Sequence, residues 1–207
     1  MKKILAIILA SLMLLTFVAC DNSNEETTTE AAGPSAEELA AAASVQDIAQ
    51  ALMNKYADYT GVRAGYDELM AELPEEEQMS YEEYCSYQLS VAPVDPEWLM
   101  GFTDVPTGFS EAYCYQPMMM GQAFIGYIFR VAEGTDIEGF KKTLTDTCDP
   151  RWNICTMANT TVCESYGDLV YFSMMVVADE ENPFGFTAEQ KDGFYNTFVE
   201  TIENSAK

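Results

Sequence analysis

The second half of this chain repeats one pattern, in which two strand-like segments are followed by a helix-like segment. The strand-like segments are rich in β-branched and aromatic residues, and Gly121–Gln122 and Gly167–Asp168 are suited to the turns within the two pairs. The predicted elements are strands at Glu111–Met120 and Ala123–Ala132, a helix at Asp136–Thr147, strands at Thr160–Tyr166 and Leu169–Ala178, and a helix at Thr187–Ser205. Two such units predict an α+β fold with an antiparallel sheet and helices packed on one face.

Helices are also predicted ahead of this repeat. Ser44 is suited to cap a helix in which apolar residues of Val45–Tyr56 recur at spacings of three and four and share one face. A short acidic helix is predicted at Tyr66–Leu73. It ends there because the proline that follows disfavours helical geometry in the residue before it. An S-x-x-E capping-box pattern at Ser80 predicts a third helix that runs through Ser90.

The amino terminus has the three parts of an export signal. Lys2 and Lys3 precede an uncharged apolar run of 16 residues, Ile4–Ala19, which is shorter than the roughly 20 residues that a membrane-spanning helix needs. The ending Phe17-Val18-Ala19-Cys20 resembles the lipobox of bacterial lipoproteins, although Phe17 stands where that pattern prefers leucine. The resemblance implies cleavage between Ala19 and Cys20 and lipidation of Cys20. The alternative is an ordinary secretory signal with a chance cysteine.

The sequence therefore divides into three regions. Residues 1–19 are predicted to be a lipoprotein signal peptide, residues 20–44 a lipidated cysteine followed by an acidic disordered tether, and residues 45–207 a single α+β domain. Residues 21–44 contain six acidic and no basic residues, with little apolar surface to bury. We expect the protein on the extracytoplasmic face of the cell membrane, held there by lipid.

Several segments together resemble a known group of proteins. Besides the lipobox and the acidic tether, they are Trp98-Leu99-Met100-Gly101-Phe102, the strand Phe124–Val131 that leads into a lysine-bearing helix, and the hairpin Gly167-Asp168-Leu169-Val170-Tyr171. This layout is similar to small cell-envelope lipoproteins of Gram-positive, Clostridia-type gut anaerobes that carry a domain of unknown function. The resemblance covers most of residues 90–205 and implies a compartment and a fold, without a catalytic signature.

Composition excludes several kinds of function. The 207 residues include no histidine, which rules out a Ser-His-Asp triad and histidine-bound zinc or haem. The net charge of −24 argues against nucleic-acid binding, because phosphate backbones are held by clustered lysine and arginine. The chain also lacks the S-x-x-K, G-x-S-x-G, P-loop and G-x-G-x-x-G patterns. We therefore predict no enzymatic activity and no cofactor.

Five cysteines remain once Cys20 is assigned to the lipid. They are Cys85, Cys114, Cys148, Cys155 and Cys163. Cys148 and Cys155 flank a six-residue loop, so a disulfide between them is one candidate, and Cys155–Cys163 is its nearest rival. The spacings offer neither a C-x-x-C redox motif nor four thiolate ligands, and no metal site is predicted.

Three residues are candidate ligand contacts. Arg130 lies within a predicted strand, and Arg151 stands next to Trp152 in the loop between the two cysteines of the candidate disulfide. Each arginine is expected to face either a carboxylate of the protein or an anionic ligand.

These observations favour a monomeric, membrane-anchored domain that binds an envelope protein or a small ligand without catalysis. One alternative is an enzyme that acts on envelope glycan or peptidoglycan through a pair of carboxylates. Another is the small-ligand-binding lipoprotein of a transporter.

Overall fold

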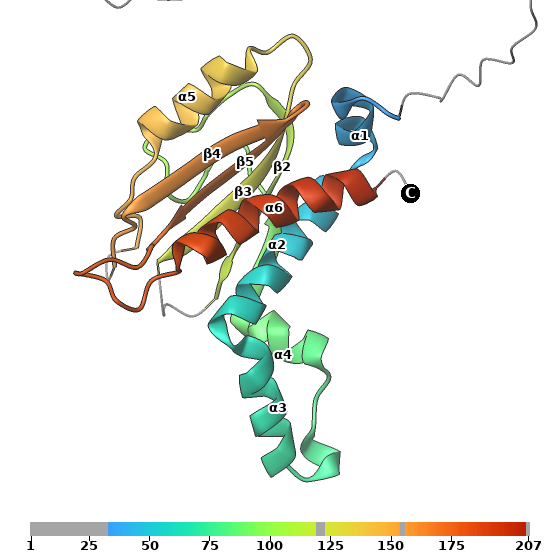
Figure 1. Ribbon diagram of the computed structural model, residues 1–207, viewed down its shortest axis with the longest axis vertical. Coiled ribbons are helices and arrows are strands. Elements are labelled where there is room, and N and C mark those ends of the chain that lie inside the picture. Colours follow the sequence, from blue (N-terminus) through green and yellow to red (C-terminus); the bar gives the residue numbers. More distant parts are fainter. Residues whose placement is uncertain (1–32, 119–122, 154–155, 206–207) are drawn as a thin grey trace, which may run out of the picture. The chain divides into compact units, whose positions relative to one another are not determined.

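The computed structural model describes residues 33–118, 123–153 and 156–205. Residues from Pro34 onward form one compact unit, built around a five-stranded sheet (Figure 1). The strands are β1 (Leu89–Pro93), β2 (Phe109–Pro117), β3 (Phe124–Val131), β4 (Thr160–Tyr166) and β5 (Leu169–Met175). All neighbouring strands are antiparallel, in the order β1-β2-β3-β5-β4. The predicted α+β class is therefore confirmed.

Helices cover both faces of the sheet, which corrects the prediction that they lie on one face. Helices α2 (Val45–Thr60) and α6 (Ala188–Asn204) pack on one face, and α5 (Ile137–Thr147) packs on the other. The central strands β3 and β5 explain this arrangement, because each presents buried apolar side chains to both faces of the sheet. Met174 belongs to the cluster beneath α5, and its neighbour Met175 belongs to the cluster beneath α2 and α6. Strands that are apolar on both sides need cover on both sides.

The fold begins earlier in the chain than the predicted boundary at Val45. Helix α1 (Ala36–Ala42) is capped by Ser35, whose side chain accepts a hydrogen bond from Glu38 N, while the backbone nitrogen of Ser35 donates one to the Glu38 carboxylate. Ala40 is fully buried, and it packs against the β4–β5 turn. Residues 36–42 thus belong to the domain and not to a disordered tether, because tertiary contacts supply the burial that their composition lacks.

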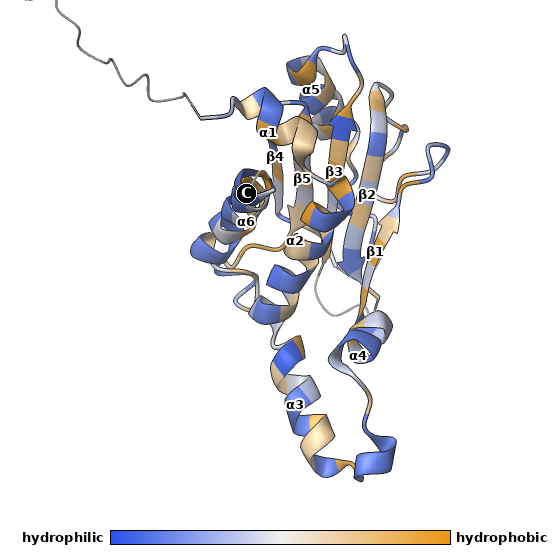
Figure 2. Cartoon of the chain, turned by 90° about the vertical axis from the view of Figure 1, so that its right-hand side faces the viewer, coloured by the Kyte–Doolittle hydropathy of each residue, from blue (hydrophilic) through white to orange (hydrophobic). Residues whose placement is uncertain are grey.

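Helices α3 (Val62–Glu72) and α4 (Tyr81–Gln88) form a helical arm that extends beyond the sheet (Figures 1 and 2). Gly61, in the left-handed conformation, ends α2 and redirects the chain into α3. The short 3₁₀ helix η1 (Glu75–Glu77) lies between α3 and α4 in the chain. Tyr66 holds them together: its ring contacts the rings of Tyr81 and Tyr84, and its hydroxyl donates a hydrogen bond of 2.9 Å to the carbonyl of Met79.

Strand β1 corrects the prediction of a helix through Ser90. Helix α4 ends at Gln88, and the chain then runs antiparallel to β2 from Leu89, which pairs with Pro117, to Pro93, which pairs with Tyr113. Proline is tolerated here because β1 lies at the edge of the sheet.

Within the described residues, none of the helices is both long enough and apolar enough to span a membrane.

Candidate functional site

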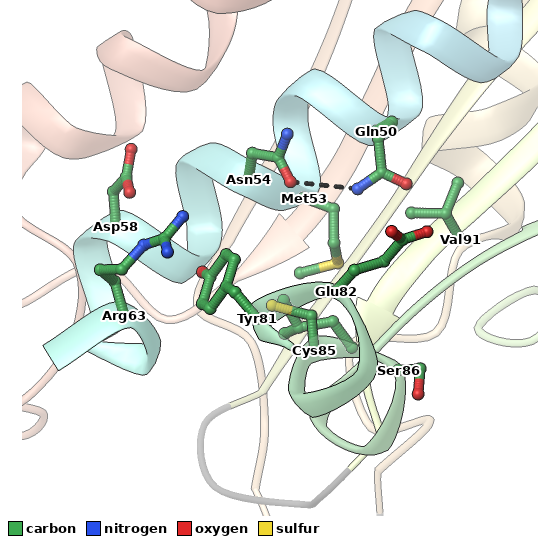
Figure 3. A pocket seen from close by; sticks show the side chains of 11 residues that line it. Gln50, Met53, Asn54, Asp58, Arg63, Tyr81, Glu82, Cys85, Ser86 and Val91 are labelled. Atoms are coloured by element: carbon green, nitrogen blue, oxygen red, sulfur yellow. Dashed lines mark hydrogen bonds between the residues drawn. The ribbon is translucent and has the colours of Figure 1, made fainter. Parts of the chain in front are cut away.

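A concave site lies where the helical arm joins the body of the domain, and it is a cleft of about 660 Å³ (Figure 3). Its walls come from α2, the start of α3, α4 and β1. The lining residues are Gln50, Met53, Asn54, Asp58, Arg63, Tyr81, Glu82, Cys85, Ser86, Leu89 and Val91. Small-molecule sites typically enclose about 300–1,000 Å³, so the cleft has room for such a ligand.

Helical periodicity explains why these residues share a cleft. On α2, Met53 and Asn54 follow Gln50 by three and four residues, which places all three on one side of the helix. On α4, Tyr81 and Cys85 are four residues apart and face α2 in the same way. These two helix faces form opposite walls of the cleft.

Arg63 and Tyr81 form the best-defined contact of the cleft. The guanidinium carbon lies 3.3 Å from the centre of the Tyr81 ring, which is a cation–π contact between α3 and α4. Burial, followed by the neighbouring Cys85 thiol, raises the pKa of Tyr81 to about 12, while Arg63 lowers it. The phenol is thus neutral at physiological pH, and its ring holds the guanidinium in place through a π face.

The rest of the lining combines an apolar floor with a polar rim. Met53 is fully buried at the floor. At the rim, Gln50 Nε2 donates a hydrogen bond of 3.1 Å to Asn54 Oδ1, as the dashed line in Figure 3 shows. The carboxylates of Asp58 and Glu82 are exposed to solvent. This arrangement is suited to binding and orienting a molecule, since it lacks the desolvated acid that general acid catalysis at neutral pH needs.

Arg130, one of the predicted ligand contacts, is occupied by the protein itself. Its guanidinium makes a 2.9 Å ion pair with Asp168, lies 3.8 Å from Glu111, and donates hydrogen bonds to the carbonyls of Ala40 and Ala43. Only 19% of its side chain is exposed. Of the two partners expected for Arg130, the structure shows the carboxylate, and its donors tie the end of α1 to β3 and the β4–β5 turn.

Arg151 and Trp152 lie in a loop away from the cleft lining. The backbone nitrogen of Arg151 donates to Asp149 Oδ1, and its side chain is exposed. Trp152 packs against the apolar cluster beneath α5, with its Cβ 3.7 Å from the position that a Cβ on Gly101 would take. The structure thus brings none of the three predicted contacts into the cleft.

The thiols of the described cysteines are free. Cys148, predicted to pair with Cys155, donates instead to the carbonyl of Thr145, the residue three positions before it at the end of α5. Cys155 lies outside the described residues. Burial raises the pKa of both Cys114 and Cys163 to about 12.

The predicted lipidation site also lies outside the described residues, so the assignments of Ala19 and Cys20 stay predictions. The described part of the chain holds no group of three or more cysteine, aspartate or glutamate side chains arranged to hold a metal ion.

The position of Arg63 was a local sequence signal for the cleft, and the sequence analysis missed it. Arg63 stands in the first turn of α3, where no acidic residue is present. The amino-terminal end of a helix favours carboxylates over cations. A cation in the first turn is therefore unfavourable for the helix dipole of α3. The contact with Tyr81 joins residues from separate helices and could not be read from spacing.

Comparisons of this chain with protein-family models, with curated proteins and with solved structures found no match.

Proposed function

We propose that this chain is a lipid-anchored protein of the extracytoplasmic membrane face, and that its domain binds a small ligand in the cleft between α2 and α4 without transforming it. The observation that carries the binding role is the cleft itself, which combines a volume of about 660 Å³, a buried apolar floor and a few polar groups at the rim. Ligand sites have this composition in general.

The geometry favours binding over the alternative of a carboxylate enzyme. A glycoside hydrolase needs one carboxylic acid that burial keeps protonated near neutral pH. In the cleft, Asp58 and Glu82 are both exposed to solvent. The proposal therefore assigns these carboxylates to the recognition of a ligand.

Replacement of Cys20 by alanine tests the anchor. We expect the wild-type chain to enter the detergent phase of a Triton X-114 extract and the Cys20→Ala variant to be lost from it, because two acyl chains anchor stably and the variant has none. Cys85→Ala is the matched control, since it also removes one thiol and keeps Cys20. A Cys20→Ala variant that still partitions with the detergent would exclude the lipobox.

The thiol of Cys85 offers a direct test of the cleft. Cys85 lines the cleft, whereas burial raises the pKa of the thiols of Cys114, Cys148 and Cys163, which keeps them protonated at neutral pH and slow to react. In full chains carrying Cys155→Ser, we expect an alkylating reagent to modify Cys85 first. A solute that occupies the cleft should slow this reaction severalfold, as read by mass spectrometry.

A cleft-filling variant serves as the reference for that experiment. Gln50→Trp places a large ring into the cleft from α2, and it should slow the modification of Cys85 without any solute. The screen should include amino acids, short peptides, sugars and nucleosides. If no class of solute protects Cys85 while Gln50→Trp does, the cleft is not a binding site for such ligands and the proposed function fails.

A further inference from the structure

One end of the cleft presents a cation that the protein leaves available. Arg63 is exposed, and within the described residues it makes no ion pair with a carboxylate. Its stacking on Tyr81 uses a face of the guanidinium and leaves the N–H groups at its edge free. That planar edge matches a carboxylate in a bidentate geometry.

The opposite end of the cleft presents an anion. In the view of Figure 3, Glu82 and Arg63 lie on opposite sides of Tyr81 and Cys85, and all four residues line the cleft. The carboxylate of Glu82 can accept an ammonium group, and the amide of Gln50 can hydrogen-bond to a neighbouring peptide group.

Between these ends the surface is apolar. The side chain of Met53 forms the floor, with Leu89 and Val91 from β1 beside it. Methionine adapts its shape to different apolar partners. An occupant therefore needs an apolar body with a separate charge at each end.

The charges also limit what the occupant can be. Two carboxylates, Asp58 and Glu82, line the cleft against a single cation, Arg63. A purely anionic ligand would meet repulsion, while a purely cationic ligand would cover Arg63 and leave its charge unpaired, which is costly. A molecule with both a carboxylate and an ammonium group satisfies both ends.

From this arrangement we infer that the cleft binds a zwitterion with an apolar body, of the short-peptide or amino-acid class, with its carboxylate on Arg63 and its ammonium group on Glu82. This inference rests on the proposed function, and it names the ligand class of the same cleft.

Calorimetric titration of the full chain in detergent with the tripeptide Ala-Leu-Ala tests this inference. We expect the free tripeptide to bind, and its N-acetylated form and its C-terminal amide each to bind about tenfold more weakly or worse, because each lacks one of the two charges. Free leucine is titrated in parallel. Binding of leucine with equal affinity would assign the site to amino acids, and weaker binding would assign it to peptides.

Protein variants then locate each charge. Arg63→Gln should weaken binding of the free tripeptide about tenfold but cause no further loss for the C-terminal amide, and Glu82→Gln should behave in the same way toward the N-acetylated form. Such non-additivity is expected only for groups in contact. The crossed combinations, such as Arg63→Gln with the N-acetylated form, should be additive.

Two matched variants control for charge and helix position. Lys55→Gln removes the other cation that lies over a tyrosine ring on α2, 5.2 Å from the centre of Tyr59, and Glu83→Gln removes the neighbouring carboxylate of the first turn of α4. Neither residue lines the cleft. Both variants should bind the tripeptide like the wild type, and cooperative thermal melting of Arg63→Gln and Glu82→Gln confirms that they fold.

The outcomes separate this inference from the proposed function. If the capped and free tripeptides bind equally, or if Arg63→Gln acts equally on the free and amidated forms, the assignment of the two ends is wrong. If no peptide or amino acid binds while another solute protects Cys85, the ligand class is wrong and the binding role stands. If no solute protects Cys85, the binding role fails as well.

Discussion

Replacement of Gly126 by alanine is expected to destabilise the domain by about 3 kcal/mol, at the upper end of what overpacking of a core costs. Gly126 lies in the central strand β3, directly opposite Tyr115 of β2, whose ring is fully buried and crosses over the glycine. A Cβ at position 126 would lie 2.1 Å from Cζ of Tyr115 and 2.3 Å from its hydroxyl oxygen. The ring cannot move aside without displacing its neighbours in the core.

Equilibrium unfolding in urea measures this effect, and Gly65→Ala is its control. Gly65 lies inside α3, where an added Cβ would lie at an ordinary distance of 3.5 Å from the Tyr84 hydroxyl. Alanine is a better helix former by about 1 kcal/mol, so this variant should be neutral or more stable. In the double variant Tyr115→Leu with Gly126→Ala, the loss should be smaller than the sum of the single losses, since the smaller side chain makes room. Additive losses would show that the Tyr115 ring is not the cause.

Replacement of Arg130 by methionine should cost about 2 kcal/mol, since it removes charged hydrogen bonds from a largely buried site. The guanidinium donates to the carbonyls of Ala40 and Ala43 and pairs with Asp168 in the β4–β5 turn. We reduce the cost expected for a buried ion pair because the side chain of Asp168 is 41% exposed. Loss of these bonds should release α1 first.

Amide hydrogen exchange together with urea unfolding distinguishes this effect from a general loss of stability. In Arg130→Met, protection should fall most at Ala36–Ala42, which form α1. Lys142→Met is the control, because Lys142 pairs with Asp146 on the exposed surface of α5. Such surface pairs contribute roughly 0–1 kcal/mol. Equal losses in the two variants, with no local change at α1, would contradict the role of Arg130.

Much of the secondary structure follows from local sequence. Ser44 and Ser80 were each predicted to cap a helix, and each accepts a hydrogen bond from the backbone nitrogen three residues later. Strand β4 has the predicted bounds Thr160–Tyr166, and β5 begins at the predicted Leu169. Caps, apolar periodicity and turn glycines act over a few residues, so the sequence pattern contains them.

Other features depend on partners that are distant in the chain. Strand β1 continues directly from α4, and only its pairing with β2 makes Leu89–Pro93 extended. The role of Arg130 depends on α1, some 90 positions earlier in the sequence. Leu89 and Ser90 were predicted to be helical, and the bonds from Arg130 to α1 were not predicted, because a local pattern specifies conformational preference and not a distant partner.

The sequence by itself determined the α+β class, the two strand–strand–helix units and the acidic charge, because each of these depends on composition or on short spacings. Tertiary structure decided which arginine is available. In the folded chain, the guanidinium of Arg130 is hydrogen-bonded to groups of the protein. The guanidinium of Arg63 lies over the Tyr81 ring and lines the cleft. The physical reason is that the surroundings of a charged side chain, and thus its availability to a ligand, are set by residues from other elements.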